Sequence, residues 1–392
     1  MTTTINNEHK KLNVPNLRFP EFEGEWEKCK VSDLLDFYST NSLSWDKLEY
    51  GTDAIKNLHY GLIHVGLPTM IDLSKDKLPN ITNGNTPKNY ELCQEGDIAF
   101  ADASEDTNEV AKAVEFYKLK GKDVICGLHT IQGRDNQQKT VVGYKGYAFS
   151  STAFHHQIRR IAQGTKIYSI NSKNFSECYI GIPSKEEQKK IATLLRLIDE
   201  RIVTQNKIID KLQSLIKGIA QKIVHSNKTN VRLSECVECS SSTLQESDVC
   251  EHGAYPVYGA NGIVGYLDNY NTEGEAVYII KDGSGVGTVS YVTGKCSATG
   301  TLNTLQAKEG YSLQYLYYLL KVFNFEPYKT GMAIPHIYFK DYGKAKFFCP
   351  SYTEQLQYAQ SLSAIDSKLL VEKNILTSLS MQKKYLLRQM FI

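Results

Sequence analysis

The 392-residue sequence contains no apolar run long enough to cross a lipid bilayer. Its first residues, Met1 to Lys11, are polar and lack the apolar segment of a secretion signal. We therefore expect a cytoplasmic protein without a membrane partner. The net charge is also small, at +2, so overall charge neither indicates nor excludes a nucleic acid that contacts part of the surface.

Support for disulfide bonds or a metal site is weak. Nine cysteines, an odd number in a chain without a secretion signal, indicate reduced thiols. One cluster, formed by Cys236, Cys239, Cys250 and His252, has enough donors for a zinc ion. However, the first half of the chain has no counterpart, and Cys-x-His is an unusual second ligand pair. We therefore interpret these four as ordinary loop and strand residues and predict no bound metal.

Catalytic motifs are also missing. The Gly-x-Gly-x-Gly motif at 283–287 falls between candidate strands at 277–280 and 288–292, whereas a dinucleotide site requires a strand, a loop and then a helix. A hairpin turn is the better interpretation, and the Gly-Lys-Cys at 294–296 is interpreted as a surface turn. The His and Arg pairs within 155–160 suit contact with solvent or phosphate better than catalysis. Because an Asn-Pro-Pro-aromatic methyltransferase motif is absent as well, the sequence indicates binding rather than catalysis.

An internal repeat is the main positive feature of the sequence. Residues 164–224 align without a gap onto residues 331–391, at a constant offset of 167. Shorter matches upstream relate 96–100 to 274–278 and 128–132 to 302–306. Each half is therefore expected to be a globular module followed by a segment that both halves share. The matched pairs include Gly164/Gly331, Ile167/Ile334, Ile170/Ile337, Pro183/Pro350, Ser184/Ser351, Glu187/Glu354, Gln188/Gln355, Ile198/Ile365 and Asp199/Asp366.

The shared segment has the apolar period of a coiled-coil helix. Apolar residues recur at alternating steps of four and three, which is the 3.5-residue period of a seam between two helices. An ordinary buried helix is the alternative. Gln205 and Glu372 occupy equivalent polar positions near the middle of the two seams, where a polar residue can fix the register. The predicted seam residues are Ile191, Leu195, Ile198, Ile202, Ile209, Leu212, Ile216, Ile219 and Ile223 in the first copy, and Tyr358, Leu362, Ile365, Leu369, Leu376, Leu379, Leu386 and Met390 in the second.

Both helices are expected to begin with the same signal. A proline, Pro183 or Pro350, precedes a serine that is followed three residues later by a glutamate. This is the pattern of a capping box, in which the serine hydroxyl accepts from the third amide and the glutamate reaches back to the cap. If the two helices pair antiparallel, the two modules are related by approximate two-fold symmetry.

The modules are predicted to be mixed and rich in strands. Short apolar runs at 98–100, 277–280 and 288–292 are bounded by Gly, Asn and Asp, as strands with tight turns are. One helix is predicted at 313–323. The fold class is thus α+β: two strand-rich modules, each followed by a long helix, with the helices paired as an antiparallel coiled coil with pseudo-two-fold symmetry. The expected boundaries are an N-terminal arm at 1–25, modules at 26–183 and 226–350, and helices at 184–225 and 351–392.

Several motifs resemble the specificity subunit of type I restriction-modification enzymes. They are the opening run 17–26 (LRFPEFEGEW), the run 255–262 (YPVYGANG), Gly127-Leu128-His129-Thr130 and the two helix starts. The resemblance covers nearly the whole chain; Phe348-Cys349 before Pro350 departs from the usual aliphatic residue.

The resemblance implies a function and a set of partners. Such subunits carry two target recognition domains, each reading one half of a split sequence in double-stranded DNA, and the paired helices act as spacer and as docking surface for two modification subunits. The chain itself would have no catalytic role and no cofactor. S-adenosylmethionine, ATP and Mg would belong to the modification subunits and to the restriction (translocase and nuclease) subunits, and the target adenine would be flipped out of the duplex.

Two other functions are weaker interpretations. A coiled-coil scaffold or tandem protein-binding module without DNA specificity would also explain the duplication and the heptads, but not the motifs. A self-contained restriction enzyme is disfavoured because nuclease and methylase motifs are missing.

Candidate DNA-binding residues are donors and acceptors in the variable parts of the modules, which could reach base edges or phosphates. Ser104 is included because its turn corresponds to the turn of Asp282 in the repeat. The candidates are Lys56, His59, Tyr60, His64, Ser104 and Arg134 in the first module, and Tyr258, Asn261, Lys281, Asp282 and Ser284 in the second.

Overall fold

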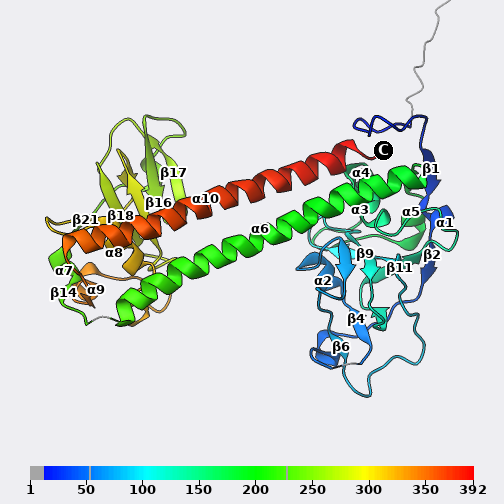
Figure 1. Ribbon diagram of the computed structural model, residues 1–392, viewed down its shortest axis with the longest axis horizontal. Coiled ribbons are helices and arrows are strands. Elements are labelled where there is room, and N and C mark those ends of the chain that lie inside the picture. Colours follow the sequence, from blue (N-terminus) through cyan, green and yellow to red (C-terminus); the bar gives the residue numbers. More distant parts are fainter. Residues whose placement is uncertain (1–12, 53, 227) are drawn as a thin grey trace, which may run out of the picture. The chain divides into compact units, whose positions relative to one another are not determined.

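The computed structural model describes residues 13–52, 54–226 and 228–392. The chain divides into two compact units (Figure 1): unit 1 is Met1–Thr204 with Leu376–Ile392, and unit 2 is Gln205–Ile375. Each unit combines a strand-rich module with part of two long helices, α6 (Lys185–Ser226) and α10 (Tyr352–Gln389). The expectation for Met1 to Lys11 lies outside the described residues. Within the described ranges, no helix has the length and apolar character needed to cross a membrane.

The first module is built on a five-stranded sheet with the order β2-β11-β7-β9-β5. The predicted strand at 98–100 is β7, and it is central and fully buried. Strands β2, β11, β7 and β9 are antiparallel neighbours, and β5 pairs parallel with β9. The strands are β2 (Asp36–Tyr38), β5 (Met70–Asp72), β7 (Ile98–Ala101), β9 (Ala113–Lys118) and β11 (Thr130–Arg134).

The second module repeats this sheet without the parallel edge strand, in the order β15-β21-β18-β19. All its pairs are antiparallel, and β18 and β19 form the hairpin predicted around the glycines at 283–287. Helix α8 (Leu313–Leu320) is shorter than the predicted 313–323, because the chain turns after Leu320. The strands are β15 (Val237–Ser241), β18 (Glu275–Ile280), β19 (Val289–Thr293) and β21 (Leu302–Ala307).

Each module also has a second sheet, and these second sheets differ. The first has the order β10-β4-β6-β3 and the second β17-β16-β20, while small pairs β1-β13, β8-β12 and β14-β22 complete the modules. Their bounds are β1 (Glu27–Lys30), β3 (Leu48–Glu49), β4 (Lys56–Leu58), β6 (Asn80–Ile81), β8 (Ala103–Ser104), β10 (Val124–Cys126), β12 (Tyr168–Ser169), β13 (Tyr179–Ile182), β14 (Val231–Arg232), β16 (Tyr255–Gly259), β17 (Gly262–Leu267), β20 (Ser297–Ala298) and β22 (Lys346–Phe347). The short helices are α1 (Val31–Leu34), α2 (Tyr60–His64), α3 (Lys145–Phe149), α4 (Thr152–Ile161), α5 (Ser172–Ser176), α7 (Leu233–Cys236) and α9 (Phe339–Tyr342), with 3-10 turns η1 (Trp45–Lys47), η2 (Glu246–Asp248) and η3 (Glu326–Tyr328).

The long helices bury most of the predicted seam. In unit 1, Ile191, Leu195 and Ile198 join one hydrophobic core with Leu386 and Met390, which come from the other helix. The prediction is wrong at Tyr358, which is 37% exposed, whereas the neighbouring Ala359 is buried. Its ring instead lies 6.0 Å from the ring of Tyr315 in the module, so the start of α10 packs on the module before the seam begins.

The two helices are antiparallel within each unit. In unit 1, Gly181, just before α6, faces Ile392, whereas Asp199, further along α6, binds Lys383 at 2.6 Å. In unit 2, the Gln205 side-chain amide donates to the backbone carbonyl of Glu372 at 3.0 Å and also to its carboxylate. These two polar seam residues are equivalent in the repeat and contact each other, as antiparallel pairing of duplicated helices requires.

The predicted capping boxes form only in part. At α6, the Ser184 hydroxyl accepts from the Glu187 amide at 3.3 Å, but the Glu187 carboxylate binds the Arg18 guanidinium at 2.7 and 2.8 Å instead of reaching back. At α10, the Glu354 carboxylate does accept from the Ser351 amide at 3.1 Å, and the Ser351 hydroxyl donates to that carboxylate at 2.6 Å. At the first helix, the Glu187 carboxylate therefore pairs with Arg18 instead of completing the capping box.

An equivalent glutamine attaches each long helix to its module. The buried Gln188 accepts from the Val141 amide at 2.9 Å and donates to the Pro183 carbonyl at 2.9 Å. Gln355 is equally buried and does the same with Ser312 and with its own preceding proline, Pro350, also at 2.9 Å. In Figure 1, α3 lies beside the start of α6 and α8 beside the start of α10. The repeat thus includes the contact between module and helix.

A second repeated contact comes from tyrosines. Tyr144 donates to the Gly181 carbonyl at 2.6 Å, and Tyr315 donates to the Phe348 carbonyl at 2.8 Å. Both phenols are buried, so each hydrogen bond satisfies a hydroxyl that would otherwise lack water. The predicted α+β class with two similar modules and antiparallel helices is confirmed.

Candidate nucleic-acid interface

A closed turn marks the point where the gapless repeat begins in each module. We call residues 163–169 and 330–336 the repeat turns. Gln163 and Ser169 exchange two backbone hydrogen bonds of 2.9 and 2.8 Å, and Thr330 and His336 exchange two of the same lengths. The glycine that follows, Gly164 or Gly331, has a φ of +142° or +87°, and a side chain there would overlap a carbonyl oxygen of its own turn. Only glycine fits this position.

Each repeat turn pairs with the turn that follows the central strand of the sheet. In the first module, β12 pairs antiparallel with β8, so Tyr168 lies opposite Ser104. In the second module, Asp282 forms a bridge with His336. Ile170 donates to the Asp102 carbonyl and Ile337 to the Lys281 carbonyl, at 3.0 and 2.9 Å.

This register refines one expectation. Because Asp102 occupies the place of Lys281, Ser104 corresponds to Gly283, one residue beyond Asp282. The turns do correspond, as predicted. Lys281, Asp282 and the exposed Ser284 therefore lie together beside one repeat turn, and Ser104 lies beside the other.

Three predicted residues of the first module belong to helix α2 or its cap. His59 is the N-cap, and its Nδ1 accepts from the Gly61 amide at 3.1 Å. Its side chain is 3% exposed, between the rings of Trp45 and Tyr60 at 4.5 and 4.8 Å. Burial lowers the pKa of His59, which fits the neutral form that a cap acceptor requires. His59 thus shapes the site, while Tyr60 and His64 are half-buried at its surface.

The α2 residues meet the turn of Ser104. The His64 Nε2 lies 2.9 Å from the backbone carbonyl of the residue before Ser104. The Tyr60 ring is 5.2 Å from the ring of His129, whose Nδ1 is 3.1 Å from the Asp102 carboxylate. His129 is half-exposed and has a left-handed backbone, with a φ of +55°. His129 belongs to the motif at 127–130, and Asp102 precedes the candidate Ser104 in the same turn. Neither His129 nor Asp102 was predicted from the sequence as a DNA-binding residue.

Lys56 lies on β4 in the second sheet of the first module. It lines a shallow cleft together with Asp76, Lys77 and Lys122. Three lysines around one carboxylate make this cleft basic, which suits a phosphate. The lining residues of this cleft lie at 50–52, 56, 76–78, 80 and 122, outside α2 and the turn of Ser104.

Tyr258 and Asn261 come from the second sheet of the second module. Tyr258 lies on β16, and Asn261 is exposed in the tight turn to β17. A short segment connects Tyr258 to the repeat-turn region: Thr299 donates to the Tyr258 carbonyl and the Thr301 carbonyl accepts from Lys281, both at 2.9 Å. Burial raises the pKa of Tyr258, so its hydroxyl stays protonated and can donate.

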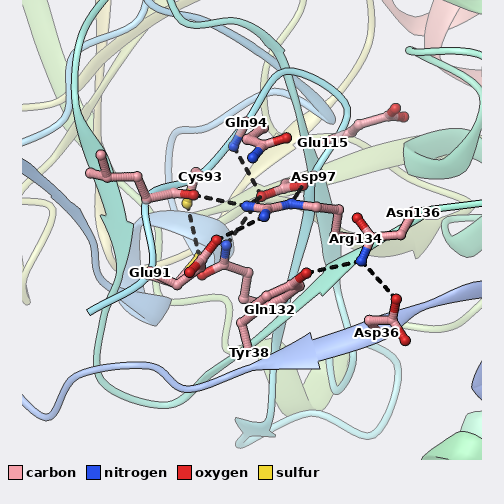
Figure 2. Close-up of polar contacts among 12 residues, drawn as sticks. Asp36, Tyr38, Glu91, Cys93, Gln94, Asp97, Glu115, Gln132, Arg134 and Asn136 are labelled. Atoms are coloured by element: carbon pink, nitrogen blue, oxygen red, sulfur yellow. Dashed lines mark hydrogen bonds and ion pairs between the residues drawn. The ribbon is translucent and has the colours of Figure 1, made fainter. Parts of the chain in front are cut away.

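Arg134 differs from the other candidates because it belongs to an internal ion network (Figure 2). Its Nε and Nη2 donate to the two carboxylate oxygens of Asp97, both at 2.8 Å, and its Nη1 donates to Glu91 at 2.7 Å. The guanidinium also lies 4.5 Å from the ring centroid of Tyr38. The Asp97 side chain is 1% exposed and that of Arg134 11%. Arg134 thus joins the end of β11 to the segment that precedes β7.

The possible zinc cluster is divided among several elements. Cys236 ends α7 and its Sγ lies 4.0 Å from that of Cys349, while Cys239 lies on β15. Among the residues that the structure describes, no group of three or more His, Cys, Asp or Glu is placed to hold a metal ion.

The fold defines a two-module protein made by internal duplication, with equivalent polar turns in both modules. The family model of the type I restriction modification DNA specificity domain matches residues 77–214 and 225–381. The chain belongs to this family. Specificity subunits are non-catalytic components of restriction-modification complexes, which agrees with the expectation of a binding chain.

Individual relatives agree with the family match. A protein described as a type I specificity subunit of Mycoplasma genitalium is 26% identical over 306 residues, which span 70% of this chain and 78% of that protein. The EcoprrI specificity subunit of Escherichia coli is 27% identical over 113 residues, and this match spans 29% of the chain and only 28% of that subunit.

Solved structures show the same fold. The crystal structure of the type I S subunit from M. genitalium superposes with a TM-score of 0.64 at 19% identity, covering 97% of this chain and 99% of that one. A chain from a structure of a type I restriction-modification system gives a TM-score of 0.55 at 14% identity, covering 92% and 96%.

Proposed function

We propose that this chain reads a bipartite sequence in double-stranded DNA within a type I restriction-modification complex, with one half-site for each module. The duplication carries the proposal: the central sheet, the glutamine contact and the repeat turn all occur twice. Two similar modules in one chain suit a split target, because the spacing of protein domains sets the spacing of half-sites.

The proposed DNA-contacting residues lie around the repeat turns, in the basic cleft, or on the hairpin of β16 and β17 in the second module. The modules that carry them correspond to the proposed target recognition domains at 26–183 and 226–350. His59 and Arg134 leave the set because they are committed to a helix cap and to an ion network. The remaining residues are Lys56, Tyr60, His64 and Ser104 in the first module, and Tyr258, Asn261, Lys281, Asp282 and Ser284 in the second.

We further propose that two modification subunits dock on the outer faces of the long helices. Several large apolar residues on these helices point away from the seam and remain exposed, as a surface for partner helices would require. S-adenosylmethionine would be bound by those subunits, and ATP and Mg by the restriction subunits. The exposed residues are Leu197, Val203 and Met381 in unit 1, and Leu215, Leu370 and Val371 in unit 2.

A module exchange tests the division into half-sites. Residues 26–163 are replaced by the corresponding module of a relative, and the chimera is reconstituted with its modification subunits. We expect one half of the methylated adenine motif to change and the other to stay, because each module has its own sheet and core. Sequencing that maps modified adenines gives the motif. If both halves changed, the modules would not act independently.

The same assay separates the alternative function. A coiled-coil scaffold or protein-binding module without DNA specificity would leave the modification subunits without a defined motif whichever module is present. A sequence-specific methylation pattern that depends on this chain would exclude that alternative.

A further inference from the structure

Each repeat turn exposes an isoleucine at the same position. Ile167 is 62% exposed and Ile334 is 67% exposed, although isoleucine is a residue that folding normally buries. The next isoleucine in each copy, Ile170 or Ile337, is buried, at 7% and 1% exposed. The same segment therefore anchors one isoleucine in the module and presents the other to solvent, and it does so twice in one chain.

The exposed isoleucines are held in a rigid setting. Two backbone hydrogen bonds close each turn, and a third ties the residue that follows it to the neighbouring turn. The left-handed glycine, Gly164 or Gly331, brings the chain back so tightly that a side chain at that position would overlap the carbonyl of Ile167 or Ile334. A fixed turn loses little conformational entropy when its tip enters a partner.

The surroundings of both tips favour DNA as the partner. Exposed Lys166 precedes Ile167, and Lys281 is hydrogen-bonded through its backbone to Ile337 at the base of the other turn. Both turns lie beside the polar residues proposed to contact DNA, namely Ser104 and Asp282. In protein–DNA complexes, apolar side chains contact the methyl group of thymine or insert at base steps, while nearby lysines hold the phosphates.

We propose that Ile167 and Ile334 are specificity-determining residues that enter the DNA groove, each making an apolar contact with base edges in the half-site of its own module. This inference rests on the proposed function and adds the residues that would read bases without hydrogen bonds. An apolar base contact contributes to sequence discrimination but releases no counterions. Its removal should therefore lower specific affinity and leave the salt dependence of binding unchanged.

The test uses Ile167→Ser and Ile334→Ser in the full chain, assembled with its modification subunits. The probes are the duplex that carries the mapped methylation motif and two duplexes in which one half-site is scrambled. We expect each variant to bind the intact duplex about tenfold more weakly, within the range for loss of one base contact. Each variant should also lose discrimination between the intact duplex and the duplex in which the half-site of its own module is scrambled. Discrimination against the other scrambled duplex should remain, so the two variants should affect different halves of the motif.

Controls separate a base contact from a change in folding. Because both isoleucines are exposed, the melting temperature should stay that of the wild type. Ile167→Val and Ile334→Val keep an apolar tip and should retain most of the affinity. Val142→Ser, at a 45% exposed apolar position away from the repeat turn in the sequence, should leave DNA binding unchanged.

The outcomes distinguish this inference from the proposed function. If the wild-type complex discriminates its motif and both serine variants bind and discriminate equally well, the isoleucine contact is excluded while the function stands. If the variants hold DNA normally but fail to assemble with modification subunits, the tips contact protein, which also overturns the inference. If the wild-type complex shows no sequence preference at all, the proposed function itself falls.

Discussion

At the scale of single residues, Arg134 shows why the partners of a candidate residue cannot be predicted from the sequence around it. It is a cation at the end of β11. Arg134 makes a paired contact with Asp97, which lies 37 positions earlier in the chain, and the carboxylate also accepts from the Gln132 side chain at 3.1 Å. Hydrogen bonds to Asp97 raise the pKa of Arg134, so the guanidinium stays charged at all relevant pH values. A pairing between distant residues leaves no local pattern in the sequence.

The first prediction follows from this burial. Arg134→Ala should reduce the free energy of unfolding by about 3 kcal/mol, because it leaves the buried Asp97 carboxylate without its charge partner. Urea unfolding followed by circular dichroism measures the change. Arg160→Ala, at an exposed position on α4, is the matched control and should cost less than about 0.5 kcal/mol. Equal stability of the two variants would show that the ion network contributes little.

A second prediction concerns pH and the cap of α2. Burial, and then the nearby His129, lower the pKa of His59 below its ordinary value of 6.5. Between these two pKa values the unfolded chain takes up a proton that the folded chain does not, so stability should fall as the pH drops below about 6.5. Protonation also removes the Nδ1 lone pair that accepts from the Gly61 amide.

The test compares unfolding free energies from about pH 7.5 to pH 5 in the wild type and in His59→Asn. Asparagine keeps an acceptor suited to an N-cap but does not titrate in this range. The fall in stability with decreasing pH should become shallower in this variant. His252→Asn, at an exposed position in the other module, should leave the slope as it is. An unchanged slope in His59→Asn would mean that other groups determine the acid sensitivity.

At the scale of helices and strands, local patterns predicted the central elements and failed where distant segments meet. The apolar runs gave β7, β18 and β19, and the proline and serine signals gave the starts of both long helices. The second sheets were not predicted, because their strands are short and pair across long separations, as β4 does in parallel with β10. Ile167 and Ile334 were seen as matched positions, but a matched apolar residue looks the same in sequence whether it is buried or exposed.

The contact between module and helix leads to a third prediction. Gln188→Ala removes both a donor and an acceptor from a buried position and leaves the Val141 amide unsatisfied. Gln355→Ala does the same to Ser312 in the second module. Each variant should lose about 1 to 3 kcal/mol of stability, the cost of a buried polar group without a partner.

Local hydrogen exchange should show where each loss occurs. Gln188→Ala should reduce protection around α3 and the start of α6, and Gln355→Ala around α8 and the start of α10. Gln157, on α4, offers a control because its side chain exchanges hydrogen bonds with the Tyr179 backbone rather than capping a long helix. Gln157→Ala should leave the starts of both long helices protected. Loss of protection in only one of the two glutamine variants would show that the duplicated contact is no longer equivalent.

At the scale of the whole molecule, the duplication accounts for features that have no local explanation. Gln205 and Glu372 are the equivalent polar residues of two seams, and they contact each other in unit 2. Direct contact between equivalent residues is expected only at the symmetry point of an antiparallel pair. A polar contact at that point penalises a shift of one helix along the other, because any shift would bury an unpaired amide and carboxylate.

The last prediction treats α6 and α10 as the element that sets the distance between the half-sites. Adding one heptad near Gln205 and one near Glu372 keeps the seam in phase in both helices and lengthens the pair by about 10 Å. This is close to three base pairs at about 3.4 Å each, although the added DNA rotation of roughly 100° must be absorbed by the modules. The half-sites should stay the same while the unread spacer between them grows by about one to three base pairs. A heptad in one helix only should instead mismatch the seam and destabilise the protein, which makes it the control. Mapping the methylated motif of the double-insertion variant with its modification subunits decides the matter, since an unchanged spacer in an active complex would show that the helices do not set the separation.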